Sequence, residues 1–93
     1  MSVINCWISL GLRPVGDELE PSLLHFRHTR IKDFIIHDVR QTMNHFGGYK
    51  EVFVSDNKIV FYGKDKDGTL IAIVWLKQEI NITKVIQEMK ERK

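Results

Sequence analysis

The side chains best suited to chemistry stand close together in His25-Phe26-Arg27-His28. Two histidines three residues apart can share one face of a helix, and imidazoles are frequent zinc ligands. Zinc needs three or four ligands, so Cys6, His37 or His45 would have to supply the others. No second paired motif accompanies them, and solvated histidines are the simpler interpretation. We therefore expect neither a metal nor a cofactor.

The same stretch belongs to the densest group of basic side chains in the sequence. No acidic residue interrupts this basic cluster before Asp33. A helix beginning here would add free N–H groups and a dipole that favour anions. The cluster could bind a phosphate, a nucleic-acid backbone or an acidic protein surface, or it could be a solvated face. Its members are His25, Arg27, His28, Arg30 and Lys32.

Residue patterns typical of a catalytic site are weaker in this sequence than the basic cluster. Cys6 could pair with a histidine, but the pattern around it predicts a core position, where thiols are inert. His37 and Asp38 are neighbours and would point to different sides of a helix. No Gly-rich phosphate loop, nucleophile elbow or zinc-protease helix occurs. An enzyme is not expected, and a small histidine-dependent hydrolase or nuclease is the remaining enzymatic alternative.

Size and composition indicate one small globular domain over residues 1–93. The chain has 93 residues, 43% of them hydrophobic and 28% charged, with a net charge of +2. This charge is too small for a dedicated nucleic-acid binder. A lone cysteine excludes an internal disulfide and favours a reducing, cytoplasmic location. The uncharged run before Arg13 is too short to span a bilayer, so no membrane association is expected.

One stretch, from Thr69 to Leu76, predicts the central strand of a sheet. Its eight residues carry no charge and are rich in β-branched and aromatic side chains. Both faces are apolar, which is typical of a strand covered on both sides.

The first half of the chain predicts a strand, a connector and a helix. Alternation from Val3 to Leu10 indicates a strand with one face in the core. The polar, proline-containing segment 11–21 reads as a surface connector. Residues 22–28 fit a short strand or a short helix capped by Ser22, and we favour the strand. Residues 30–46 show helical spacing, with Thr29 as the cap and Ile31, Ile35 and Val39 buried.

The second half predicts a β-meander and a last helix. Residues 49–55 and 58–63 form a hairpin around Asp56-Asn57, and a polar loop then leads into the central strand. Asn81 caps a closing helix. The order β-(β)-α-β-β-β-α predicts an α+β fold, a two-layer sandwich with a mostly antiparallel sheet and two helices on one face.

This arrangement leaves an apolar sheet face without a helix. We expect either a partner, including a second copy of the chain, or the segment 11–28 to cover it. The first hypothesis is therefore a non-enzymatic interaction module that binds a protein or itself through this face. The alternative is a nucleic-acid or anion binder that uses the basic cluster. The residues expected on the apolar face are Ile71, Ile73, Trp75, Trp7 and Phe53.

The expected absence of a structural metal gives a first prediction. Excess EDTA should leave the thermal unfolding midpoint unchanged, because a structural zinc ion would contribute folding energy directly. Circular dichroism melts with and without the chelator make the measurement. A large drop in the midpoint would restore His25 and His28 as metal ligands.

Overall fold

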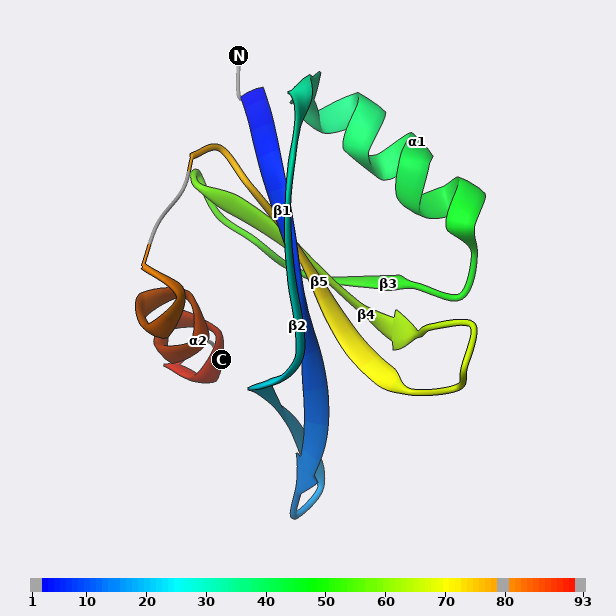
Figure 1. Cartoon of the computed structure of the whole chain (residues 1–93), viewed down its shortest axis with the longest axis vertical. Helices are drawn as coiled ribbons and strands as arrows, with labels where there is room; N and C mark the ends of the chain where they lie inside the picture. Colours follow the sequence, from blue (N-terminus) through cyan, green and yellow to red (C-terminus); the bar gives the residue numbers. More distant parts are fainter. Residues whose placement is uncertain (1–2, 79–80, 92–93) are drawn as a thin grey trace.

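A computed structural model of the chain shows a five-stranded sheet and two helices (Figure 1). It describes residues 3–78 and 81–91. Every pair of neighbouring strands is antiparallel, and the order across the sheet is β2-β1-β5-β4-β3. The elements are β1 (Val3–Val15), β2 (Glu18–Ile35), α1 (Ile36–Phe46), β3 (Lys50–Val54), β4 (Lys58–Lys64), β5 (Leu70–Leu76) and α2 (Ile82–Glu91).

Strand β5 is the central strand, as its sequence predicts. It pairs with β1 on one side and with β4 on the other. Ile71, Ile73 and Trp75 are buried on one face, and Ala72 and Val74 are buried on the other. The predicted α+β class, the antiparallel sheet and the order of elements are confirmed, and residues 22–28 do form a strand.

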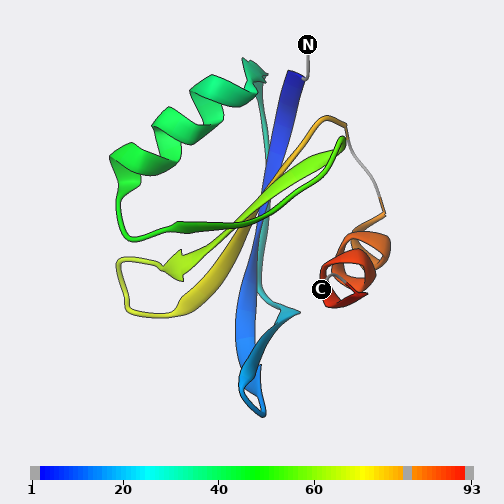
Figure 2. The same ribbon diagram turned by 180° about the vertical axis from the view of Figure 1, so that it is seen from behind.

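The two helices lie on opposite faces of this sheet, which corrects the predicted placement on one face (Figures 1 and 2). In α1, Val39 and Met43 join the cluster around Trp75. In α2, Val85 and Met89 join the cluster on the other face. The physical reason lies in β5, because a strand that is apolar on both sides needs a cover on each. Neither helix in the described part of the chain has the length and apolar character that a membrane span requires.

Helix α1 begins later than its spacing predicts. The predicted helix over residues 30–46 starts only at Ile36, and the preceding residues complete β2. There Ile35 pairs with Val3 and Phe34 with Ile4, while Thr29 lies inside the strand and caps nothing. β-Branched residues favour a strand, and pairing with β1 outweighs the helical spacing. Ile35 is consequently 37% exposed.

The predicted connector over residues 11–21 is also wrong, because these residues form a β-hairpin. Strand β1 continues to Val15, and the chain turns at Gly16, whose φ is +63°. Pairing between β1 and β5 ends at Gly11, so the hairpin projects beyond the sheet as a two-stranded arm. Both strands of this arm lie outside the pairing with β5 and are edge strands, and edge strands accept proline, here Pro14 and Pro21.

A buried cation fastens α2 to the sheet. Lys58 is almost fully buried, and its ammonium forms an ion pair with the Glu88 carboxylate. The same ammonium lies 5.3 Å from the centre of the Phe53 ring. At the start of α2, the predicted cap is confirmed, since Asn81 Oδ1 accepts a hydrogen bond of 2.8 Å from the Thr83 N–H.

The corrected start of α1 predicts unequal effects of two core-type substitutions. Met43→Ala should lower the free energy of unfolding by about 2–5 kcal/mol, because it leaves a cavity under α1. Ile35→Ala should lower it by less than about 1 kcal/mol, because that side chain is partly solvated. Urea denaturation measures both. Equal losses would place Ile35 in the core and contradict the observed strand.

The ion pair predicts how acid weakens the fold. Hydrogen bonding to Lys58, opposed by burial, lowers the pKa of Glu88. A carboxyl whose folded pKa is depressed stabilises the protein above its unfolded pKa, and this contribution disappears as pH falls through the folded pKa. The difference in unfolding free energy between wild type and Glu88→Gln should therefore be largest near pH 7 and shrink between about pH 5 and pH 2. Urea titrations across this range measure it.

The matched control for this titration is Glu51→Gln, which removes the exposed pair with Arg40. An exposed pair contributes less than about 1 kcal/mol. A Glu88→Gln difference that is equally large at pH 7 and at acid pH would show that the ion pair does not fasten α2.

Candidate functional site

A groove of about 410 Å³ opens on the α1 face of the sheet. The sheet provides apolar side chains from Trp7, Ile71 and Ile73. A bulged segment of β2 lines a second side with His25, Phe26 and Arg27. The loop between β4 and β5, with the nearby Tyr49, lines a third. The groove thus combines aromatic, aliphatic and charged groups from segments far apart in the sequence.

A large bulge in β2 forms one side of the groove. Ser9 pairs with Arg27 and Gly11 with Ser22, so Leu10 alone faces the four residues 23–26. At Gly11, an added Cβ would lie 2.7 Å from the Leu24 carbonyl oxygen, so the bulge needs glycine beneath it. The extra residues push apolar side chains outward. Those most exposed are Leu23 at 56%, Leu24 at 66% and Phe26 at 43%.

His25 sits at the bend of this bulge. Its φ of +58° makes it the one non-glycine residue with a positive φ among the residues that the structure describes. A β-bulge re-aims the side chains that it contains. The bend thereby brings His25 and Phe26 to the groove instead of leaving them in regular alternation along the strand.

The opposite side is fixed by a hydrogen-bonded loop. Asp65 Oδ1 accepts hydrogen bonds of 2.9 Å from the N–H groups of Asp67 and Thr69. This Asx-type turn, completed by Gly68 at φ +83°, holds Lys66 and Asp67 at the groove. The loop is therefore held by hydrogen bonds among its own residues, from the Asp65 side chain as well as from the backbone.

Tyr49 closes the groove next to this loop. Its ring rests against Gly63, where any side chain would collide with it. Burial raises the pKa of the Tyr49 hydroxyl, and the nearby Asp65 carboxylate raises it further. The hydroxyl therefore stays protonated at neutral pH and can donate a hydrogen bond.

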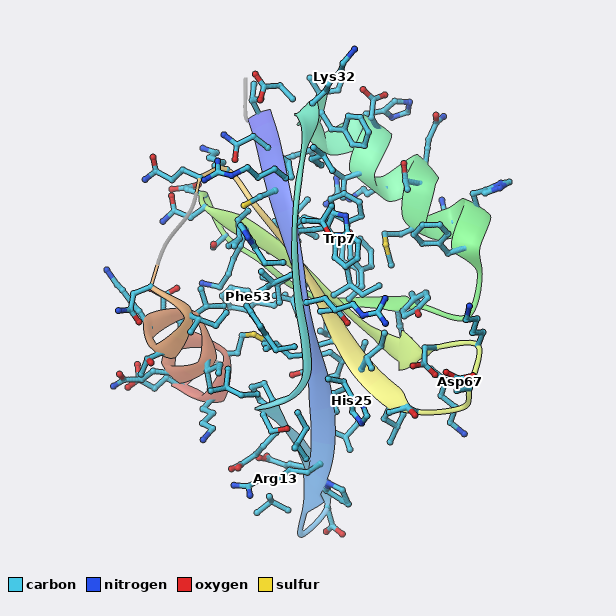
Figure 3. The ribbon with its side chains drawn as sticks, in the orientation of Figure 1. Trp7, Arg13, His25, Lys32, Phe53 and Asp67 are labelled. Atoms are coloured by element: carbon cyan, nitrogen blue, oxygen red, sulfur yellow. The ribbon has the colours of Figure 1, made fainter. Side chains whose placement is uncertain are left out.

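The predicted apolar face is divided by the observed cover. Trp7 lines the groove as a partly exposed side chain, and Ile71 and Ile73 line it although both are largely buried. Trp75 is buried outside the groove lining, with its ring 6.1 Å from the ring of Trp7. Phe53 lies on the other face, beside α2 (Figure 3). Helix α1 and the end of β2 supply most of the cover, instead of the segment 11–28. The groove is a part of this face that the observed cover leaves open.

The predicted basic cluster is also divided, because β2 alternates. Arg27 pairs with Ser9 and reaches the groove with His25. His28 pairs with Ile8, and Arg30 pairs with Cys6, whose side chains lie on the α2 face. Cross-strand partners share a face, so these two basic residues point away from the groove.

The fifth basic residue, Lys32, lies at a second bulge close to the start of α1 (Figure 3). The five side chains therefore do not form one continuous patch.

The side chains of the groove are of types that bind a ligand by contact and charge. Among residues 3–78 and 81–91, no three His, Cys, Asp or Glu side chains gather to hold a metal ion. Cys6 is buried on the α2 face, on the far side of the sheet. The groove offers aromatic and aliphatic surface together with a guanidinium, an imidazole, an ammonium and two carboxylates. Sequence reasoning missed Phe26, Tyr49 and Lys66, and the signal for the last was the turn sequence Asp65-Lys66-Asp67-Gly68.

Comparison with known protein families, with curated proteins and with solved structures finds no match for this chain. The groove is therefore interpreted from its own residues. Its lining, its charges and its position between two ordered segments carry the functional argument.

Proposed function

We propose that this chain is a non-enzymatic interaction module that binds a protein partner through the groove. The observation that carries the proposal is a groove in which the partly exposed Trp7, with Ile71 and Ile73 beneath, meets charged groups. Interface centres are rich in aromatic and aliphatic anchors, and their rims are polar. The groove is also the uncovered remainder of the sheet face for which the sequence suggested a partner.

The bound group is an apolar side chain of an extended partner segment. A groove of about 410 Å³ accommodates one or two large side chains but no folded element. Aromatic residues line it from two directions, through Trp7 on the sheet and Tyr49 beside the loop. A phenylalanine or leucine of the partner would therefore be in contact with rings on both sides.

Two basic side chains, one on each side of the groove, suggest a partner segment that carries carboxylates. Arg27 and Lys66 contribute two positive charges at the margin. Asp65 and Asp67 add two negative charges on the loop side, where the Asp65 carboxylate also accepts two backbone hydrogen bonds. Carboxylates that flank the apolar anchor would meet Arg27 and Lys66.

A peptide titration followed by NMR tests the proposal. The probe is Ac-Glu-Leu-Phe-Glu-NH₂, and its controls are Ac-Lys-Leu-Phe-Lys-NH₂ and Ac-Glu-Ala-Ala-Glu-NH₂. The acidic Leu-Phe peptide should shift the indole N–H signal of Trp7 and the amide signal of Thr69. Both controls should bind at least about tenfold more weakly, since each lacks one of the two recognition elements.

A pair of charge variants sharpens the result. Lys66→Glu should lower the affinity for the acidic peptide several-fold. Lys90→Glu, on the helix of the opposite face, should leave that affinity unchanged. Equal affinity for all three peptides, or an unchanged affinity in Lys66→Glu, would contradict binding in this groove.

A further inference from the structure

We infer that the groove continues into a second hollow at the end of α1, and that the two together hold an extended partner segment by apolar side chains at alternate positions. The inference rests on the proposed function, because it specifies the segment that the groove binds. Three features support it: the side chains that line both hollows, the open apolar surface at the end of α1, and the placement of the basic groups.

The second hollow shares a boundary with the groove. Its volume is about 430 Å³, and it lies between the end of α1 and the loop that joins β4 to β5. These two segments lie side by side in both views of the ribbon (Figures 1 and 2). Tyr49, Ile73 and the loop residues Asp65 and Lys66 line both the groove and the second hollow. The two hollows are therefore neighbouring parts of one surface.

The far side of the second hollow is apolar and open. Phe46, the last residue of α1, lines it and is 59% exposed. Gly47 comes next, with a φ of +69°, and a Cβ added there would meet nothing within 4 Å beyond its chain neighbours. The chain thus leaves α1 at a residue without a side chain, which keeps the space beside the Phe46 ring free. That ring is available to an apolar side chain of a partner.

The common boundary predicts the spacing of the side chains that enter the two hollows. In an extended chain, alternate side chains point to the same side and lie roughly 7 Å apart, whereas adjacent side chains point to opposite sides. Two hollows separated by one layer of side chains match the alternate spacing. The partner segment therefore carries one apolar side chain for the groove and another, two positions along, for the second hollow.

Basic side chains are present in both hollows. Arg27 lines only the groove, Lys64 lines only the second hollow, and Lys66 lines both. A segment with a carboxylate beyond each apolar side chain would bring one to Arg27 and the other to Lys64. Single-stranded nucleic acid also binds to aromatic rings beside basic groups. The Asp65 and Asp67 carboxylates would repel a continuous run of phosphates, so the charges favour a peptide with carboxylates only at its ends.

Three peptides of equal length and charge test the spacing. Ac-Glu-Leu-Ser-Phe-Ser-Leu-Glu-NH₂ has a leucine at the alternate position on either side of the phenylalanine, so that both chain directions fit. Ac-Glu-Ser-Leu-Phe-Leu-Ser-Glu-NH₂ has the same composition with adjacent apolar side chains, and Ac-Glu-Ala-Ser-Phe-Ser-Ala-Glu-NH₂ keeps the phenylalanine alone. The alternating peptide should bind at least about tenfold more tightly than either control, since burial of a leucine side chain is worth roughly that factor.

NMR signals distinguish the two hollows during the titration. The indole N–H of Trp7 reports the groove, and the amide of Gly47 reports the second hollow. The alternating peptide should shift both signals with the same affinity, because one molecule occupies both hollows. A shift at Trp7 without one at Gly47 would overturn the inference and leave the proposed groove intact. Absence of a shift at Trp7 would contradict the groove and the inference together.

Phe46→Ala tests the second hollow from the side of the protein. It should lower the affinity for the alternating peptide at least about fivefold and leave that for the single-phenylalanine peptide unchanged. The circular dichroism melt should not change, because the Phe46 side chain is exposed. Val15→Ala, at an exposed apolar residue of the hairpin arm, is the matched control and should leave every affinity unchanged.

Two further outcomes would count against the inference. One is an equal change of affinity for both peptides in Phe46→Ala, which would show that the ring does not belong to a separate hollow. The other is displacement of the alternating peptide by an oligothymidylate of lower Kd, which would assign the rings to nucleobases.

Discussion

The structure depends on one constraint, which is that β5 has no polar face. A strand that is apolar on both sides must lie in the middle of a sheet, with cover above and below. Its neighbours β1 and β4 protect its edges, and α1 and α2 cover its faces. With two helices and two faces to cover, each helix shields part of one face. The groove is the part of the α1 face that the single helix does not reach.

The two helices are attached to their faces of the sheet by different interactions. On the α1 side, apolar contacts dominate, with Met43 and Val39 against the strand side chains. On the α2 side, a buried ammonium adds an ion pair from Lys58 to Glu88. Such a pair is sensitive to geometry, because removing one partner leaves the other charge without compensation. The ion pair therefore fixes the position of α2 along the sheet more closely than apolar contacts alone would.

Local signals predicted the elements whose patterns are self-contained. The uncharged run of β5, the hairpin of β3 and β4, and the Asn81 cap each depend on residues adjacent in sequence. The start of α1 and the arm of β1 and β2 depend on pairing between distant strands. Ile31, Phe34 and Ile35 have helical spacing, but all three lie in β2, where Phe34 and Ile35 pair with β1. The residue spacing within one segment does not show which distant strand that segment will pair with.

The groove was predictable only in part for the same reason. Alternation places Trp7, Ile71 and Ile73 on one face, and this much is legible from the sequence. Phe26 enters the groove through a bulge that shifts the alternation of β2, and the bulge depends on Gly11 in the opposite strand. The division of the basic cluster, in contrast, follows from the simple alternation of β2. A bulge is a relation between two strands, so neither strand predicts it alone.

The pairing of β1 with β5 has a consequence for how the chain folds. It joins residues about seventy positions apart, such as Cys6 and Leu76, at the centre of the sheet. During synthesis, the two local hairpins can form as soon as they emerge, but β1 must wait for the last strand before its inner edge is matched. The apolar side chains of β1 stay accessible throughout that interval. Chaperone protection would therefore matter most in the interval before residue 76 leaves the ribosome, and little once the central strand has closed the sheet.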